Sequence, residues 1–144
     1  MPRRTLKLAL LSLLLCLCGS VAVACTCVQM SVEQMYFHAD YVVVGRVTSV
    51  SERKWFFEES GRGVAVTFEV EQELKGRSTA PKKVKSGYGS WDCSVEFIVG
   101  RSYVFFVPKD GRVSYCSGTQ EFGKHWPPSE ELMKKLIELR SHAK

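Results

Sequence analysis

Tyr41-Val42-Val43-Val44-Gly45-Arg46-Val47-Thr48-Ser49-Val50 is the stretch that decides the fold class of this 144-residue chain. Its valines and its threonine are β-branched, and such residues favour an extended strand. Val64–Val70 alternates well enough to predict a second strand, and Ser102–Val107 predicts a third that ends before Pro108. Short strands separated by Gly, Pro and charged turns predict a mainly β fold, either a small barrel or a sandwich.

Two further strands are expected on weaker patterns. Lys82–Ser86 is one, and Val113–Cys116 is the other, paired with the preceding strand through a hairpin turn at Asp110-Gly111. Ser51–Gly63 is expected to be the longest loop, and it carries Trp55-Phe56-Phe57. These aromatic side chains either pack on the β-structure or form an exposed contact surface, and the sequence does not decide between the two.

Two helices are also predicted. Ser31–Ala39 starts with an acceptable N-cap and places apolar side chains on one face: Val32, Met35, Tyr36 and Ala39. Near the other end, Pro127–Glu131 supplies a break, a cap and first-turn acids before Leu132, Met133, Leu136, Ile137 and Arg140. The apolar spacing predicts that this second helix packs on the β-structure.

The first 24 residues have the three parts of a secretory signal peptide. Arg3, Arg4 and Lys7 are followed by an apolar run from Leu8 to Cys18 and by small residues at 22 and 24. The apolar run is short for a membrane-spanning helix. The sequence therefore predicts cleavage, with residues 1–24 as signal peptide and residues 25–144 as one domain.

The position of the cut decides what stands first in the exported chain. Ala22-Val23-Ala24 predicts Cys25 as the new terminus, whereas Ser20-Val21-Ala22 would leave Val23 ahead of it. A bacterial lipoprotein cut would instead acylate Cys25 and block its amine. The chain is thus expected to be secreted, or periplasmic or lipid-anchored in the envelope if bacterial.

Charge argues against a nucleic-acid partner. Removal of the signal lowers Lys+Arg from 20 to 17 against 15 acidic residues, so the net charge falls from +5 to +2. This is too weak a balance for phosphate-backbone binding. The one tight basic cluster, Lys82, Lys83 and Lys85, is explained by a solvated strand edge.

Four cysteines remain after cleavage: Cys25, Cys27, Cys93 and Cys116. An even number in an exported chain predicts two disulfides. A bridge between Cys25 and Cys27 would be strained at that spacing. The two terminal cysteines are therefore expected to bridge to the two distant ones.

The sequence offers little for catalysis. His38, His125 and His142 are scattered, and neither a Ser-His-Asp order nor a phosphate-binding glycine loop is present. A Cys-x-Cys pair is compatible with a redox dithiol, but the βαβ pattern of a thioredoxin-like enzyme is missing. We expect that the protein is not an enzyme.

Several segments keep the order and spacing of one known family. They are Cys25-Thr26-Cys27-Val28, the short helix, Ala39–Val47, Leu74-Lys75-Gly76, Cys93 before Phe97–Arg101, and Cys116 before Trp126-Pro127. Together they resemble the amino-terminal, netrin-like domain of the tissue inhibitors of metalloproteinases. The resemblance covers essentially the whole mature chain, and the cysteine positions are its most specific part.

The resemblance implies a fold and a disulfide pattern. The fold is a five-stranded OB-like barrel of the netrin-module type with a short N-terminal and a C-terminal helix, in a single-domain member of the family. The implied bridges are Cys25–Cys93 and Cys27–Cys116. The chain departs from the family at Phe37, which aligns with the first cysteine of a third bridge, and at Trp91-Asp92, where small and apolar residues are expected.

The resemblance also implies a secreted inhibitor of zinc metalloproteases. In such inhibitors the terminal α-amino nitrogen and carbonyl oxygen chelate the target's catalytic zinc, which assigns those atoms here to Cys25. Thr26 would enter the specificity pocket, and Cys27 and Val28 would continue along the cleft. Ser90-Trp91-Asp92 would complete the contact surface.

The expected partner is therefore a zinc metalloprotease, and the expected metal is the target's zinc, with no cofactor of the chain's own. The chain is expected to be a monomer without nucleic acid, and without a membrane unless Cys25 is lipidated. The alternative is a netrin-type binding module that inhibits nothing and recognises an extracellular or envelope partner.

Overall fold

The computed structural model describes residues 26–54, 62–76, 82–87, 93–123 and 127–142 of the chain. These residues form five strands and three helical elements. The strands are β1 (Tyr41–Lys54), β2 (Arg62–Lys75), β3 (Lys83–Ser86), β4 (Ser102–Val107) and β5 (Gln120–Glu121). The helical elements are α2 (Val32–His38), α3 (Pro127–His142) and the 3-10 turn η1 (Tyr115–Ser117).

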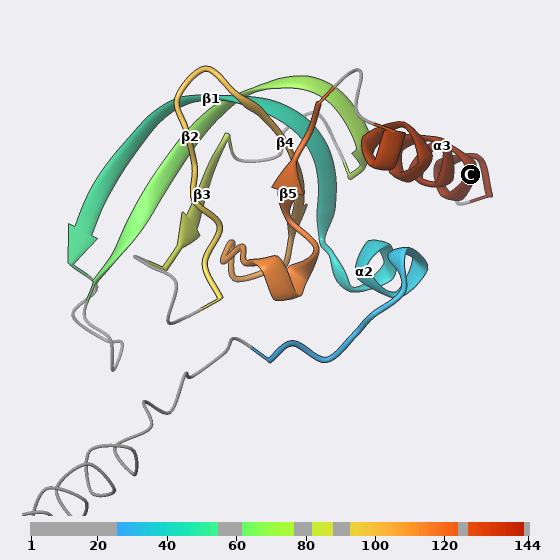
Figure 1. Cartoon of the computed structure of the whole chain (residues 1–144), viewed down its shortest axis with the longest axis horizontal. Coiled ribbons are helices and arrows are strands. Elements are labelled where there is room, and N and C mark those ends of the chain that lie inside the picture. The colour runs from blue at the N-terminus through green and yellow to red at the C-terminus, as the bar shows by residue number, and fades with distance from the viewer. Residues whose placement is uncertain (1–25, 55–61, 77–81, 88–92, 124–126, 143–144) are drawn as a thin grey trace, which may run out of the picture.

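All five strands lie in one antiparallel sheet in the order β3-β2-β1-β4-β5 (Figure 1). β1 and β2 are long and strongly curved, and register shifts after Val42, Val44 and Val47 mark bulges between them. The predicted mainly β fold is confirmed. The sheet is not closed into the expected barrel: in the described part of the chain its edge strands do not pair, and one parallel bridge joins Lys85 of β3 to Arg112.

The sheet is buried on both of its faces. One core contains Tyr41, Val43, Val47, Val66, Phe68, Val84, Val95, Tyr103, Phe105, Val107 and Val113. The other, beneath the helices, contains Tyr36, Ala39, Val42, Val44, Leu74, Val104, Phe106, Leu132 and Leu136. Because successive side chains of a strand point to opposite faces, β1 and β4 supply both cores. This is why Tyr41–Val44 of β1 and Tyr103–Val107 of β4 are unbroken apolar runs.

Gly45 lies in the middle of β1 for a steric reason. A Cβ at this position would lie 2.5 Å from the ring of Phe68 on the neighbouring strand. That ring is fully buried and stacks on Phe105, with the ring centroids 4.3 Å apart. The glycine therefore lets β1 approach the aromatic cluster of the core.

Helix α2 forms where the sequence predicts it and is held at its end by β2. Ser31 and Gln34 make a reciprocal capping box at its start. At its end the Nζ of Lys75 donates to the carbonyls of Tyr36 (2.7 Å), Phe37 (3.2 Å) and Ala39 (2.6 Å). The Tyr36 hydroxyl donates to Leu74 O at 3.1 Å. A cation at the negative end of a helix is favourable, so Lys75 fixes α2 electrostatically.

Helix α3 covers the same face of the sheet and contacts α2. Leu132 and Leu136 are buried, and Arg140 donates to Glu73 O of β2 at 2.9 Å. Lys135 pairs with Glu33 of α2 at 2.7 Å. Hydrogen bonds from Lys135 and Ser31 lower the pKa of the Glu33 carboxyl to about 2. The predicted packing of this helix on the β-structure is thus confirmed.

Three sequence predictions need correction. Val113–Cys116 is not a strand: the chain turns at Gly111, and Val113 N donates to Lys85 O of β3 instead of pairing with β4. The predicted loop at Ser51–Gly63 is shorter, because β1 continues to Lys54 and β2 begins at Arg62; its aromatic residues, 55–57, lie outside the described residues. Ile137 is exposed although its spacing predicted burial.

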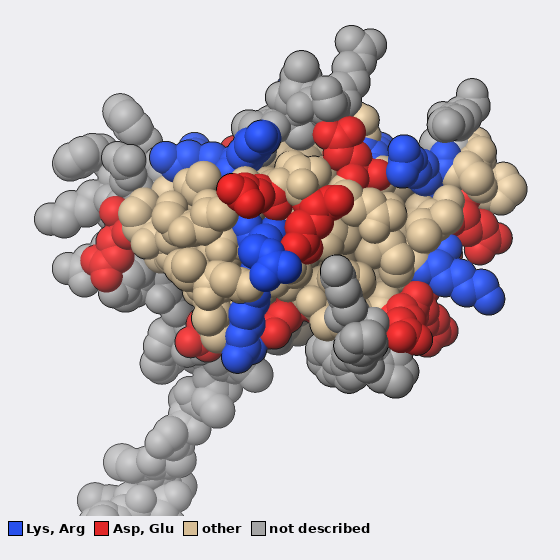
Figure 2. Space-filling model, turned by 90° about the horizontal axis from the view of Figure 1, so that it is seen from above, with Lys and Arg blue, Asp and Glu red and all other residues tan. Residues whose placement is uncertain are grey.

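The described surface mixes charges of both signs. Figure 2 shows basic and acidic side chains interspersed on the face seen from above. Exposed ion pairs include Arg46–Glu71 at 2.8 Å and Arg101–Glu121 at 3.0 Å. Lys83 and Lys85 are exposed on edge strand β3, as the interpretation of a solvated strand edge predicted. No helix among the described residues is long and apolar enough to cross a membrane.

We predict that Lys75→Met lowers the free energy of unfolding by about 1–3 kcal/mol, because three helix carbonyls lose a charged donor while the aliphatic stem is kept. Urea denaturation measures the change. Lys83→Met is the matched control, since it makes the same substitution at an exposed strand-edge lysine. Equal stability of the two variants would contradict the role of Lys75 in holding α2.

Candidate functional site

The structure describes three of the predicted contact residues: Thr26, Cys27 and Val28. They lie in the stretch from Thr26 to Met30, which runs without regular secondary structure into the N-cap of α2 (Figure 1). Thr26 and Val28 are exposed and Cys27 is half-buried. The other predicted site residues, Cys25, Ser90, Trp91 and Asp92, lie outside the described residues, so their roles stay predictions.

A disulfide joins Cys27 to Cys116 and confirms that predicted pairing. The two Cα atoms are 5.2 Å apart, and the bridge links positions 89 residues apart in the sequence. It ties the stretch before α2 to the turn η1 after β4. The stretch from Thr26 to Met30 is therefore held at both ends, by the disulfide and by the capping box of α2.

The turn that carries Cys116 is itself well fixed. The side chains of Ser114 and Ser117 each accept a hydrogen bond from the other's backbone N–H. Gly118 follows with φ of 90°, a left-handed conformation that glycine adopts without strain. Thr119 is fully buried, and its hydroxyl accepts from Phe106 N of β4 at 3.1 Å. These bonds attach Cys116, and through it Cys27, to the core.

Cys93 lies against the same bridge. Its carbonyl accepts from Tyr115 N at 3.0 Å, and the sulfur atoms of Cys27, Cys93 and Cys116 lie within 4.8 Å of one another. Cys93 is disulfide-bonded, but its predicted partner Cys25 lies outside the described residues. Cys93 has a φ of 57°, which is costly for a residue with a Cβ. The chain therefore adopts an energetically costly backbone conformation at Cys93, directly after residues 88–92 in the sequence.

The segment after Cys93 is attached to β4 through Tyr103. Its hydroxyl donates to Glu96 O at 3.1 Å and accepts from Ile98 N at 2.9 Å. Val95, which lies in the sequence between Cys93 and Glu96, is buried. Burial raises the pKa of the Tyr103 hydroxyl, which keeps it protonated as a donor. Cys93 is thereby positioned from the core side as well.

Two large apolar side chains next to the disulfide are exposed. Val28 follows Cys27 and is 85% exposed, and Tyr115 precedes Cys116 and is 56% exposed. Exposed apolar side chains that adjoin a rigid backbone are suited to protein recognition. The family resemblance implied Val28 as a contact residue, whereas Tyr115 was not predicted. Its position next to a bridged cysteine was the one sequence feature that could have indicated it. That position alone does not predict exposure, which depends on how η1 orients the ring.

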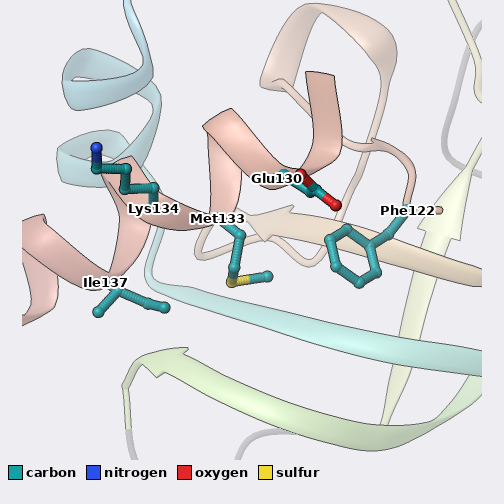
Figure 3. A pocket seen from close by; sticks show the side chains of 5 residues that line it. All are labelled: Phe122, Glu130, Met133, Lys134 and Ile137. Carbon is teal, nitrogen blue, oxygen red and sulfur yellow. The ribbon is translucent and has the colours of Figure 1, made fainter. Parts of the chain in front are cut away.

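A hollow of about 310 Å³ adjoins the bridge between α2 and η1. Its walls are Met30, Met35, His38, Ala39, Phe106, Pro108, Cys116 and Ser117. A second hollow, of about 430 Å³, lies beside α3 (Figure 3). Phe122, Met133 and Ile137 form its apolar wall, with Glu130 and Lys134 as its charged residues. The two hollows share no residue.

The chemistry of the described side chains near the bridge can be read from their bonding state. Among the described His, Cys, Asp and Glu side chains, the group close enough to hold a metal is the three cysteines, and all three are disulfide-bonded. Metals coordinate thiolates, so these sulfur atoms do not form a metal site while the bridges are intact. What the site offers a partner is an exposed stretch of backbone with apolar side chains on a rigid base.

We predict that Cys27→Ala with Cys116→Ala lowers the free energy of unfolding by about 2–5 kcal/mol, because the unfolded chain regains loop entropy. Backbone amides of the stretch from Val28 to Met30 should also exchange hydrogen faster. Denaturation and hydrogen-exchange mass spectrometry measure the two effects. Val28→Ala is the control, since this exposed side chain should leave both unchanged. Unaltered exchange in the bridge-less variant would show that the disulfide does not hold this stretch.

No protein-family model matches the chain, and no curated protein matches it. Membership of the metalloproteinase-inhibitor family therefore stays a proposal, carried by the residues and the geometry described above.

Proposed function

We propose that the protein is a secreted inhibitor of zinc metalloproteases, in which the α-amino nitrogen and the carbonyl oxygen of Cys25 chelate the target's catalytic zinc. The observation that carries the proposal is the anchored, exposed stretch that begins at Thr26, directly after the predicted new terminus. Cys27, two residues from that terminus, is bridged to the core-attached turn η1. Such a stretch can present a chain terminus in one orientation.

The chemistry of a catalytic zinc suits this use of a terminus. Such a zinc has three protein ligands and one open position that water or substrate occupies. A neutral amine and the adjacent carbonyl of one residue can replace that water as a five-membered chelate. An α-amino group has a pKa of about 7.7–8.0, so its neutral form is accessible near neutral pH, and binding to the metal favours it further. In this proposal the sulfur of Cys25 serves as an anchor.

Rigidity supplies affinity in this proposal. A flexible terminus would lose conformational entropy on entering a protease cleft, and that loss opposes binding. The Cys27–Cys116 bridge reduces this cost in advance for the described stretch. The predicted Cys25–Cys93 bridge would extend the restraint to the chelating residue, and the position of Cys93 against the first bridge supports that pairing.

The side chains on either side of the bridge would make the protein contacts. Thr26 would enter the target's specificity pocket, and Val28, exposed and apolar, would lie along the cleft. Ser90-Trp91-Asp92 would flank the stretch through Cys93. Tyr115, which precedes the bridged Cys116, adds an exposed aromatic ring that would pack on the protease rim. The inhibitor would act as a monomer and carry no metal of its own.

The fold we propose is a netrin-type OB-like barrel. The five-stranded curved antiparallel sheet with a helix at each end of the chain is consistent with it. The parallel bridge between Lys85 and Arg112 draws the segment after β4 toward edge strand β3, as closure requires. Phe37, which replaces a bridged cysteine of the family, is exposed, and α2 is held here by Lys75 instead.

We predict that the chain beginning at Cys25 inhibits zinc metalloproteases. One extra alanine ahead of Cys25 should weaken inhibition by roughly 100-fold or more, because it converts the α-amine of Cys25 into an amide that cannot chelate zinc. Each factor of ten corresponds to about 1.4 kcal/mol of binding free energy. Inhibition constants against a panel of zinc endopeptidases measure the effect, with a serine protease as a target that should not respond.

A single alanine added after Lys144 is the matched control, since it lengthens the chain equally without touching Cys25. Equal inhibition by the two lengthened chains would contradict zinc chelation. A chain that begins at Cys25 but inhibits none of the zinc enzymes would contradict the inhibitor function itself and favour the non-inhibitory binding module.

A further inference from the structure

The hollow beside the Cys27–Cys116 bridge brings together two thioethers for a local reason. Ser31 is the N-cap of α2, so Met30 occupies the position before the cap and Met35 the fourth position of the helix. Side chains at these two positions commonly pack on each other next to a capping box, in an arrangement called a hydrophobic staple. Here the capping box is present, and both methionines line the same hollow.

The Met35 sulfur lies next to the backbone of Gly118. A Cβ at Gly118 would overlap Met35 Sδ, so the thioether lies directly over the backbone that follows η1. Gly118 is therefore required at this position both for its φ and for this contact. Cys116 and Ser117, which precede Gly118, line the same hollow as Met35.

An imidazole completes the group of donors. His38 is one helical turn from Met35, so the two lie on the same face of α2, and His38 lines the same hollow. Its ring forms no hydrogen bond or ion pair with any described residue. The lining also includes the apolar residues Ala39, Phe106 and Pro108. Two thioethers and one imidazole thus share a hollow whose other walls offer little competition from hard oxygen donors.

We propose that Met30, Met35 and His38 bind a soft monovalent cation, Cu(I) or its redox-inert analogue Ag(I). Thioether sulfur selects Cu(I) among biological metals, and imidazole is compatible with it, whereas Mg²⁺ and Ca²⁺ require oxygen ligands. The site is distinct from the proposed protease contact, since it uses neither the amine nor the carbonyl of Cys25. Binding of the cation is therefore independent of the proposed inhibition of proteases.

The burial of the side chains agrees with a binding role for the two methionines. Of the α2 side chains, Tyr36 is buried in the core at 1% exposed, and Met35 packs against the edge of the same core. Met30 and Met35 are only half-buried, and their hollow is open to solvent. The hollow that both methionines line is thus accessible to a cation from solvent.

The test is a titration of the disulfide-intact protein with Ag(I) in chloride-free buffer, followed by NMR of ¹³C-labelled methionine methyl groups. Ag(I) needs no reductant, so the bridges stay intact. Met133 is an internal control, because it lies in the separate hollow beside α3 (Figure 3). We expect the Met30 and Met35 methyl signals to shift together and saturate at one equivalent, with Met133 unchanged.

Variants identify the ligands. Met30→Leu and Met35→Leu keep side-chain volume and should each weaken Ag(I) binding at least tenfold, as should His38→Gln. Met133→Leu and His142→Gln are the matched controls and should leave the affinity unchanged. Competition with a Cu(I) chelator under ascorbate gives the same ranking for Cu(I).

The proposal is overturned by a shift of one thioether alone, by an equal shift of Met133, or by no shift at one equivalent. It is also overturned if the Met30→Leu, Met35→Leu double variant, shown to be folded by its amide spectrum, binds Ag(I) as the wild type does. None of these outcomes bears on protease inhibition.

Discussion

The covalent link between Cys27 and Cys116 is the constraint on which the candidate site depends. It joins residues 89 positions apart and attaches an exposed stretch of chain to a turn that is bonded to β4. It gives the stretch before α2 a covalent link to the fold in addition to the one through the helix. With it, both side chains next to the bridge, Val28 and Tyr115, are exposed on a fixed base.

A second, non-covalent anchor acts at the other end of α2. Lys75 donates to three carbonyls at the helix terminus, and the adjacent Leu74 carbonyl accepts from Tyr36. Burial lowers the pKa of the Lys75 ammonium, but coulombic attraction to Asp40 opposes that shift. The helix between the two anchors presents Met35 and His38 toward the bridge. One short element thus connects the proposed protease contact with the proposed cation site.

The regular elements could be predicted from sequence because their signals are local. The β-branched run from Tyr41, the Ser31 cap and the apolar run from Ser102 each determine their own conformation. Val113–Cys116 could not be predicted, because Val113 bonds to Lys85 of β3, a distant partner. The exposure of Tyr115 and the shared hollow of Met30 and Met35 also depend on tertiary contacts around η1 and α2. The pairing of Cys27 with Cys116 came from a family resemblance, since spacing alone left the partners open.

The proposed mechanism requires that the exported chain start at Cys25 with a free amine, two residues ahead of the bridged Cys27. Terminal sequencing and intact mass of the protein purified after export test this most directly. We expect Cys25 as the first residue, an unmodified α-amino group, and a mass four hydrogen atoms below that of the reduced chain, because each of two disulfides forms with the loss of two hydrogen atoms. A chain that starts at Val23, or an acylated Cys25, would contradict it.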